Sequence, residues 1–219
     1  MRHEDFLSEY DESSKNSKQI ISKLKELGYD MLGSGYDSTV WSKDAGSVIK
    51  IIMPSDVVRA EGDSAFVNFY EFCKANSSPF LPKFISIGGE DHTVFTLNDV
   101  PYRQISMEKL KPIPVNTFNE QMVWALSELA VVPFIKWRDA KKQITQAEFW
   151  KHFEGPGDEQ DVIRNLANPQ TEHLWLSFLD VIKKLYIFGR GRGMGWDLHT
   201  ENVMMRGEVP VIVDPFTGS

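Results

Sequence analysis

The sequence has a single cysteine in 219 residues, Cys73, and no apolar run that approaches the length of a membrane span. One cysteine excludes an internal disulfide and any zinc site built from several cysteines, which suits a reducing cytoplasm. The first residues, MRHEDFLSEYDESSK, lack the apolar core of a signal peptide. Because a bilayer span needs about 20 apolar residues, we expect a soluble, cytoplasmic protein that makes no membrane contact.

Positive charge is also scarce. Lysine and arginine number 24 against 31 aspartates and glutamates, which gives a formal net charge of -7. Nucleic acids and anionic membranes attract clustered positive charge, so broad binding to either is not expected. Any site for a polyphosphate must therefore be a local cationic pocket in an acidic protein.

The composition that remains is that of a globular protein, with 42% hydrophobic and 25% charged residues. No internal repeat or low-complexity segment is present. The pattern predicts an α+β, two-lobed arrangement with a hinge over residues 109–114. A flexible N-terminus (1–15) precedes a strand-rich N-lobe (16–110) and a mostly helical, truncated C-lobe (111–219).

Periodicity and turn residues place the individual elements. Helices are expected over 17–27, ending at Gly28, and over 63–75, capped by Asp63. Further helices are expected over 121–132 behind a Thr117–Glu120 capping box, and over 145–153, 159–167 and 171–188. Strands are expected over 29–32, 46–53, 84–87, 93–97 and 103–108, and in a closing hairpin over 203–206 and 209–213.

The closing hairpin carries the first candidate site. In an antiparallel pair the start of one strand lies beside the end of the other, so Asn202 and Asp214 should be neighbours. Asp197 lies in the loop that leads into the hairpin. Such oxygen-bearing side chains either hold Mg²⁺ together with phosphate and water, or simply cap turns.

The strand-rich half of the sequence carries the second candidate site. Gly33-Ser34-Gly35 lies between two strands, where backbone N–H groups either approach phosphates or form an ordinary turn. Lys50 sits within an apolar strand and alternation puts it on the same side as Val48. Val48 would then cover a flat apolar ligand while Lys50 reaches its phosphates; the alternative is an edge-strand lysine whose amine reaches water.

The order of these motifs resembles the protein-kinase-like fold. GSGYDSTV is similar to the loop that covers the nucleotide, with Ser38 at the third glycine position. VIK resembles the strand motif of the phosphate-binding lysine, and ISMEKLKP the strand that enters the hinge, with Met107 as gatekeeper. The resemblance implies an ATP site formed by Gly33, Ser34, Gly35, Val40, Val48, Lys50, Met107 and the backbones of Glu108 and Leu110.

The end of the chain completes the resemblance. DLHTEN is similar to the catalytic loop, which gives Asp197 the catalytic-base position and Asn202 a metal-ligand position. VDPF is similar to the Asp-Phe-Gly element, which makes Asp214 the principal metal ligand. The implied cofactors are ATP and Mg²⁺, with Mn²⁺ as a substitute. The acidic partner of Lys50 stays open among Glu61, Asp63 and Glu71.

Two stretches narrow the resemblance further. GYDMLGSGYDSTVW…SVIKII and DLHTENVMMRGEVPVIVDPF resemble the early serine/threonine protein kinases of short-tailed (podovirus) bacteriophages. This resemblance implies a phage-encoded enzyme that phosphorylates host bacterial proteins in the host cytoplasm during infection.

Departures from the pattern keep other functions open. Gly195-Trp196 precedes Asp197 in place of the usual His-Arg pair. His199 replaces a lysine, as in small-molecule (aminoglycoside-type) phosphotransferases, and either stabilises the migrating phosphoryl group or hydrogen-bonds within the loop. GRGRGMG is interpreted as the approach to this loop rather than as an RNA-binding run. The alternatives are a small-molecule phosphotransferase and a pseudokinase that binds and inhibits a host protein.

Overall fold

The computed structural model describes residues 16–35, 38–52, 64–86, 92–124, 126 and 171–217. The helices expected over 145–153 and 159–167 lie outside the described residues, as do Glu61 and Asp63. The chain divides into two compact units. Unit 1 comprises Met1–Gly62 and Lys83–Lys109, and unit 2 comprises Asp63–Pro82 and Leu110–Ser219.

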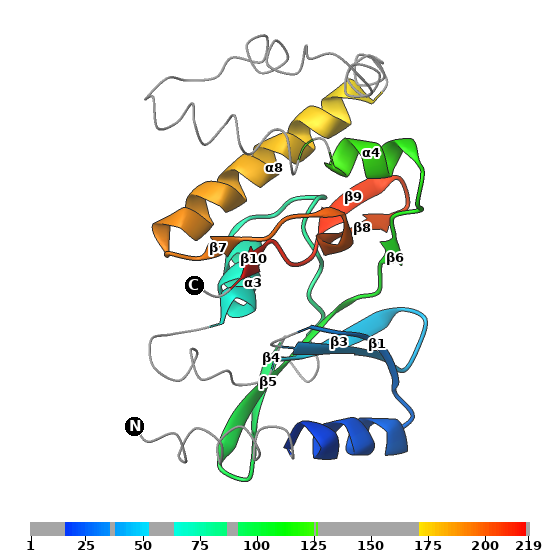
Figure 1. Cartoon of the computed structure of the whole chain (residues 1–219), viewed down its shortest axis with the longest axis vertical. Helices are drawn as coiled ribbons and strands as arrows, with labels where there is room; N and C mark the ends of the chain where they lie inside the picture. The colour runs from blue at the N-terminus through cyan, green and yellow to red at the C-terminus, as the bar shows by residue number, and fades with distance from the viewer. Residues whose placement is uncertain are drawn as a thin grey trace. The chain divides into compact units, whose positions relative to one another are not determined.

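The described part of unit 1 is built on a five-stranded antiparallel sheet with the order β1-β2-β3-β5-β4 (Figure 1). Its strands are β1 (Asp30–Ser34), β2 (Ser38–Ser42), β3 (Ser47–Ile52), β4 (His92–Leu97) and β5 (Val100–Glu108). The chain turns from β4 to β5 through Asn98 and Asp99, both with positive φ, as a two-residue hairpin turn requires.

A helix over residues 16–26 packs on one face of this sheet. Its Ile20 and Leu24 join Trp41, Ile49 and Ile51 in a buried apolar cluster. The helix ends at Gly28, as predicted, because this residue takes a φ of 82°. The Gly28 N–H then donates to the Lys25 carbonyl, and the Tyr29 N–H donates to the Leu24 carbonyl. These bonds satisfy carbonyls of the last helical turn.

The strand expected over 84–87 is wrong in its length. Only a single bridge, Phe84 to Met107, is formed by the described residues of this segment. The Lys83 N–H donates to the Glu108 side chain at 2.7 Å rather than to a backbone carbonyl. The Ile85 N–H donates to the Ser106 carbonyl, but the neighbouring residue of β5, Ile105, already pairs with His92 of β4, so the ladder cannot extend past Ile85.

The helices described in unit 2 are α3 (Ala65–Ala75), α4 (Phe118–Trp124) and α8 (Glu172–Gly191). The N-cap of α3 is Ser64, whose hydroxyl accepts from the Val67 N–H at 3.2 Å. At α4 the Thr117 hydroxyl accepts from the Glu120 N–H, and the Glu120 carboxylate accepts from the Asn116 N–H at 2.5 Å. The predicted capping box thus forms with its second bond shifted by one residue.

The position of α3 differs from the lobe division expected from the sequence. Residues 63–82 group with unit 2 and not with the strand-rich unit. The physical reason is the aromatic face of α3, on which Phe69 meets Phe216 and Phe72 meets Phe188 of α8. The burial of these rings against α8 and β10 groups α3 with unit 2, although β3 of unit 1 is the strand that precedes it in the chain.

Short strands complete unit 2 (Figure 1). The predicted closing hairpin forms as β8 (Val203–Arg206) and β9 (Val209–Ile212), and β6 (Lys111–Pro112) pairs with β8. β7 (Gly195–Trp196) pairs with β10 (Phe216–Thr217), and the 3-10 turn η2 (Thr200–Asn202) precedes β8. The predicted α+β class is confirmed, with strands dominating the described part of unit 1 and helices that of unit 2. No helix among the described residues has the length and hydrophobicity to cross a bilayer.

Candidate functional site

One face of the unit 1 sheet carries most of the nucleotide-binding residues expected from the sequence. Gly33 pairs with Val40, Val40 with Lys50, and Val48 with Met107. Directly paired residues share a face, and so do residues two apart on a strand. The register therefore places all five on the face opposite to the apolar cluster of Trp41, Ile49 and Ile51.

Lys50 is buried on this face, with only 6% of its surface exposed. Its neighbours Val48 and Met107 are buried to a similar degree. An edge-strand lysine that reaches water is thus excluded, because β3 lies between β2 and β5 and the side chain is enclosed. The Lys50 side chain is thereby held on the same face as Val48 and Met107. Of its three candidate acidic partners only Glu71 is described; it is exposed on α3, in unit 2.

The glycine turn closes through a hydrogen bond from the Gly35 N–H to the Ser38 carbonyl at 2.8 Å. Neither Gly33 nor Gly35 has a positive φ. A Cβ at Gly33 would meet nothing within 4 Å, and one at Gly35 would make only ordinary contact with Ser38. The folding of the described chain does not require glycine at either position, and the space beside the Gly33 backbone is open.

Two backbone donors at the start of the predicted hinge are already engaged. The Glu108 N–H donates to Lys83 at 2.9 Å and the Lys109 N–H donates to Gly46 at 3.0 Å. Any contact of Glu108 with an adenine edge would therefore use its carbonyl oxygen. Leu110, the other predicted contact, begins unit 2.

The turn beside this hinge is organised by a carboxylate. Asp44 accepts hydrogen bonds from the N–H groups of Gly46 and Ser47, each 2.8 Å long. These bonds stabilise the ionised form and hold the pKa of Asp44 below its usual value. The Lys109 ammonium closes the turn by donating to the Ser42 hydroxyl and the Asp44 carbonyl.

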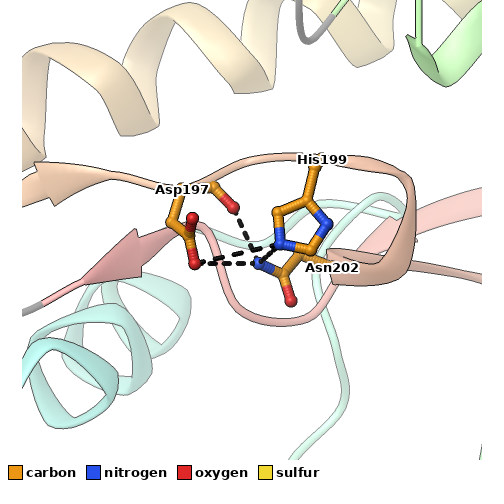
Figure 2. A network of polar contacts seen from close by, with 3 residues as sticks. All are labelled: Asp197, His199 and Asn202. Carbon is orange, nitrogen blue, oxygen red and sulfur yellow. Dashed lines mark hydrogen bonds and ion pairs between the residues drawn. The ribbon is translucent and has the colours of Figure 1, made fainter. Parts of the chain in front are cut away.

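In unit 2, the loop before η2 brings Asp197, His199 and Asn202 together (Figure 2). The Asn202 amide nitrogen donates to the Asp197 carbonyl oxygen at 2.7 Å and lies 3.4 Å from its carboxylate Oδ2. His199 Nε2 lies 3.0 Å from the same nitrogen and 3.9 Å from Asp197 Oδ2. Of the two roles considered for His199, hydrogen bonding within the loop is the one that these contacts support.

These contacts fix the orientation of Asn202. Two of the partners of its amide nitrogen are oxygens, so the nitrogen faces Asp197 and the amide oxygen points away from it, as Figure 2 shows. The Asp197 side chain itself remains 44% exposed, and that of His199 39%. The loop thus presents an accessible carboxylate and an outward amide oxygen.

Backbone hydrogen bonds join this loop to both neighbours of Asp214. The Asp197 N–H donates to the Pro215 carbonyl and the Val213 N–H donates to the Asn202 carbonyl, both at 2.9 Å. The second bond extends the β8–β9 ladder by one pair beyond Val203 and Ile212. The adjacency of Asn202 to the Asp214 segment, predicted from hairpin pairing, is therefore present in the backbone.

The donors in this segment fit a hard divalent cation. Among the described residues, no three histidine, cysteine or carboxylate side chains are close enough to share one metal ion. An oxygen set of one or two carboxylates completed by an amide, phosphate and water is what Mg²⁺ uses. The outward amide oxygen of Asn202 and the carboxylate of Asp214 match that chemistry, whereas a zinc-type site is not formed by the described residues.

Two glycines of the run GRGRGMG have a role that the sequence analysis missed. A Cβ at Gly189 would lie 2.5 Å from the Phe216 ring, and one at Gly195 would collide with the Thr217 hydroxyl. Phe216 is 5% exposed and also contacts Trp196, with ring centroids 5.8 Å apart. Gly189 and Gly195 therefore let the chain after Asp214 approach α8 and β7 closely. The only signal in the sequence was the regular spacing of the glycines, which does not indicate the residues that pack against them.

No family model and no curated protein matches the sequence. Solved structures do. The microcompartment-associated aminopropanol kinase has 12% identity and a TM-score of 0.37, over 85% of this chain and 63% of that chain. The amicoumacin kinase hAmiN, in complex with AMP-PNP and Ca²⁺, has 15% identity and a TM-score of 0.40, over 97% of this chain and 66% of that chain. The streptomycin–ATP complex of APH(2″)-IIa has 13% identity and a TM-score of 0.34, over 91% and 72%.

This chain thus spans less than two thirds of the length of the first two similar structures. At these identities and TM-scores the likeness carries no conclusion about what the chain binds or catalyses. The geometry of its own residues has to support any functional assignment.

Proposed function

We propose that this chain is an ATP-dependent phosphotransferase that moves the γ-phosphoryl group of ATP to a hydroxyl group. The observation that carries the proposal is the pair of backbone hydrogen bonds that ties the loop from Asp197 to Asn202 to both neighbours of Asp214. An exposed carboxylate, an oriented amide and a second carboxylate thereby come from one coupled segment.

In the proposed reaction Asp197 accepts the proton of the acceptor hydroxyl. A bond forms between the acceptor oxygen and the γ-phosphorus, and the bond from that phosphorus to the bridging oxygen of ADP breaks. Asn202 holds the Asp197 backbone in place through its amide nitrogen. Alignment and charge stabilisation carry most of such a reaction, since phosphoryl transfer needs little covalent chemistry from the protein.

Unit 1 supplies the proposed nucleotide site. Val48 and Met107 offer an apolar surface for the base, and Lys50 on the same face binds the α- and β-phosphates. The open space beside Gly33 supports a close approach of the backbone to phosphate. Gly33 and Gly35 would otherwise be replaceable without strain.

Asn202 and Asp214 are the residues that would hold Mg²⁺ or Mn²⁺, which when bound neutralises phosphate charge. All other steps proposed here rest on the side chains of the chain itself.

The acceptor hydroxyl has two candidate sources. The resemblance of the motifs to those of the phage kinases favours a serine or threonine of a host protein. His199 favours a small molecule, because a histidine at this place resembles small-molecule phosphotransferases. Both sources use the same carboxylate and the same nucleotide site.

Radiolabelled ATP offered with a bacterial lysate tests the proposal and separates the acceptors. The wild type should transfer label, and the variant Asp197→Asn should not. Labelled protein bands identify the protein-kinase form, and label in the fraction that passes a small-pore filter identifies the small-molecule form. Wild-type protein that adds no label beyond that of the lysate alone would reject the function and favour a pseudokinase.

A further inference from the structure

A pocket of about 210 Å³ lies beside the Asp197–Asn202 loop, in unit 2. It is lined by Glu120, Gln121 and Trp124 of α4 and by Thr200 of η2. Thr200 directly follows His199, so one wall of the pocket is part of the loop that carries the proposed catalytic base. None of the functions assigned above uses this pocket.

Helix α4 presents two different faces. Met122 and Val123 are fully buried, whereas Trp124 is 44% exposed. Glu120, Gln121 and Trp124 are spaced so that they follow one side of the helix, and that side is the pocket wall. An exposed indole is unremarkable alone, but a pocket combining an aromatic wall with a few polar groups is typical of ligand sites.

The chemistry of the lining selects a cation. Glu120 contributes a carboxylate, which its hydrogen bond with the Asn116 N–H holds at the first turn of α4. Trp124 contributes an aromatic ring, and ring faces attract ammonium and guanidinium groups. Gln121 and Thr200 add uncharged polar groups, and the lining described contains no lysine or arginine that would repel a cation.

We propose that this pocket binds the ammonium or guanidinium group of the phosphoryl acceptor, an inference that rests on the phosphotransferase function proposed above. The acceptor lays its cationic group against Trp124 and Glu120 while its hydroxyl lies at Asp197. Asp197 and Thr200 are three residues apart, so their Cα atoms are separated by at most about 11 Å. An acceptor whose hydroxyl and cationic group can lie within about this distance of each other satisfies both positions.

Two variants test the pocket without disturbing the catalytic loop. Glu120→Gln removes the charge but keeps an oxygen for the Asn116 N–H. Trp124→Leu removes the aromatic face, and Trp124→Phe retains one. Val115→Ala is the matched control, because Val115 is 75% exposed and does not line the pocket. Thermal denaturation of each variant checks that the fold is kept.

Binding is measured by calorimetry without ATP, so that the result does not depend on turnover. The probes are spermidine and a peptide with two arginines beside one serine, with a glutamine-for-arginine peptide as the neutral comparison. We expect Kd for a cationic probe to rise about tenfold in Glu120→Gln and Trp124→Leu. Trp124→Phe and Val115→Ala should bind like the wild type, and the neutral peptide should not bind.

The outcomes separate the two proposals. If Glu120→Gln and Trp124→Leu weaken the binding of spermidine but not of the peptide, the pocket is assigned to small amines. If they weaken the binding of the peptide but not of spermidine, it is assigned to basic protein segments. In turnover assays KM for the cationic acceptor should rise by the same factor, with kcat unchanged. Wild-type affinity in both variants, or no binding of either probe by the wild type, overturns the cation site even if phosphotransfer is found. Probe binding that the variants lose, in a protein that transfers no phosphate, overturns the phosphotransferase function instead.

Discussion

The backbone N–H of Asp197 donates a hydrogen bond of 2.9 Å to the carbonyl oxygen of Pro215. This bond continues the pairing of β7 with β10, in which Trp196 lies opposite Phe216. The position of the proposed base is thereby set by the residue that follows the proposed metal ligand, Asp214. A change in either segment displaces the other.

Asp197→Asn should abolish most phosphotransfer and leave the fold intact. The amide has nearly the size of the carboxylate, and the backbone bond to Pro215 does not depend on the side chain. Loss of a general base typically slows a reaction by about 10² to 10⁴-fold. Single-turnover transfer from labelled ATP measures the effect, and the thermal midpoint should stay unchanged. A variant as active as the wild type would remove Asp197 from the catalytic role.

Asn202→Ala should lower both stability and activity. The substitution removes the hydrogen bond of 2.7 Å that the Asn202 amide nitrogen donates to the Asp197 carbonyl oxygen. Such a bond contributes about 1 kcal/mol to stability. Urea denaturation measures the loss. Asn202→Asp is a sharper comparison, because a carboxylate facing the carbonyl oxygen repels it. We expect Asn202→Asp to be at least as destabilised as Asn202→Ala, and the reverse order would contradict the amide orientation in Figure 2.

Gly189→Ala and Gly191→Ala should change stability in opposite directions. A methyl group at Gly189 meets the Phe216 ring at 2.5 Å, and overpacking of this kind costs about 1–3 kcal/mol. Gly191 has no atom within 4 Å of the added Cβ and ends helix α8, so alanine there should stabilise by up to about 1 kcal/mol. Denaturant titrations of the two variants test this difference. Equal changes in stability in the two variants would mean that the Phe216 ring does not pack against Gly189.

Asp44→Ala should reduce stability at neutral pH but not in acid. Hydrogen bonds from Gly46 and Ser47 lower the pKa of Asp44 in the folded protein. A group whose folded pKa is depressed contributes stability above its unfolded pKa, about 3.9, and loses that contribution as the pH falls through the folded pKa. The difference in thermal midpoint between wild type and variant should therefore shrink below about pH 4. A difference that grows in acid would have the wrong sign.

Local sequence patterns predicted elements whose ends or turns are set by residues close to one another in the sequence. The end of the first helix at Gly28 and the closing hairpin both follow from short-range rules of backbone geometry. The same rules placed Asn202 beside the Asp214 segment, because antiparallel pairing fixes which residues meet. Alternation along β3 likewise placed Lys50 and Val48 on one face.

Long-range packing was not predictable in this way. Nothing local indicates that α3 joins unit 2, since its aromatic face would suit any apolar partner; its contact with Phe216 decides the matter. Because His92 of β4 already pairs with Ile105 of β5, the strand expected over 84–87 is limited to a single bridge at Phe84. The pocket at Trp124 combines residues that lie about 80 positions apart, and no sequence motif links them.

Calorimetric titration of ATP, with and without Mg²⁺, tests the central claim, the proposed ATP-dependent phosphotransferase function. Wild-type protein should bind ATP with Mg²⁺ and far more weakly without it. Lys50→Met in unit 1 and Asp214→Ala in unit 2 should each abolish the Mg²⁺-dependent binding while both variants remain folded. Unchanged Mg²⁺–ATP affinity in either variant would contradict the claim.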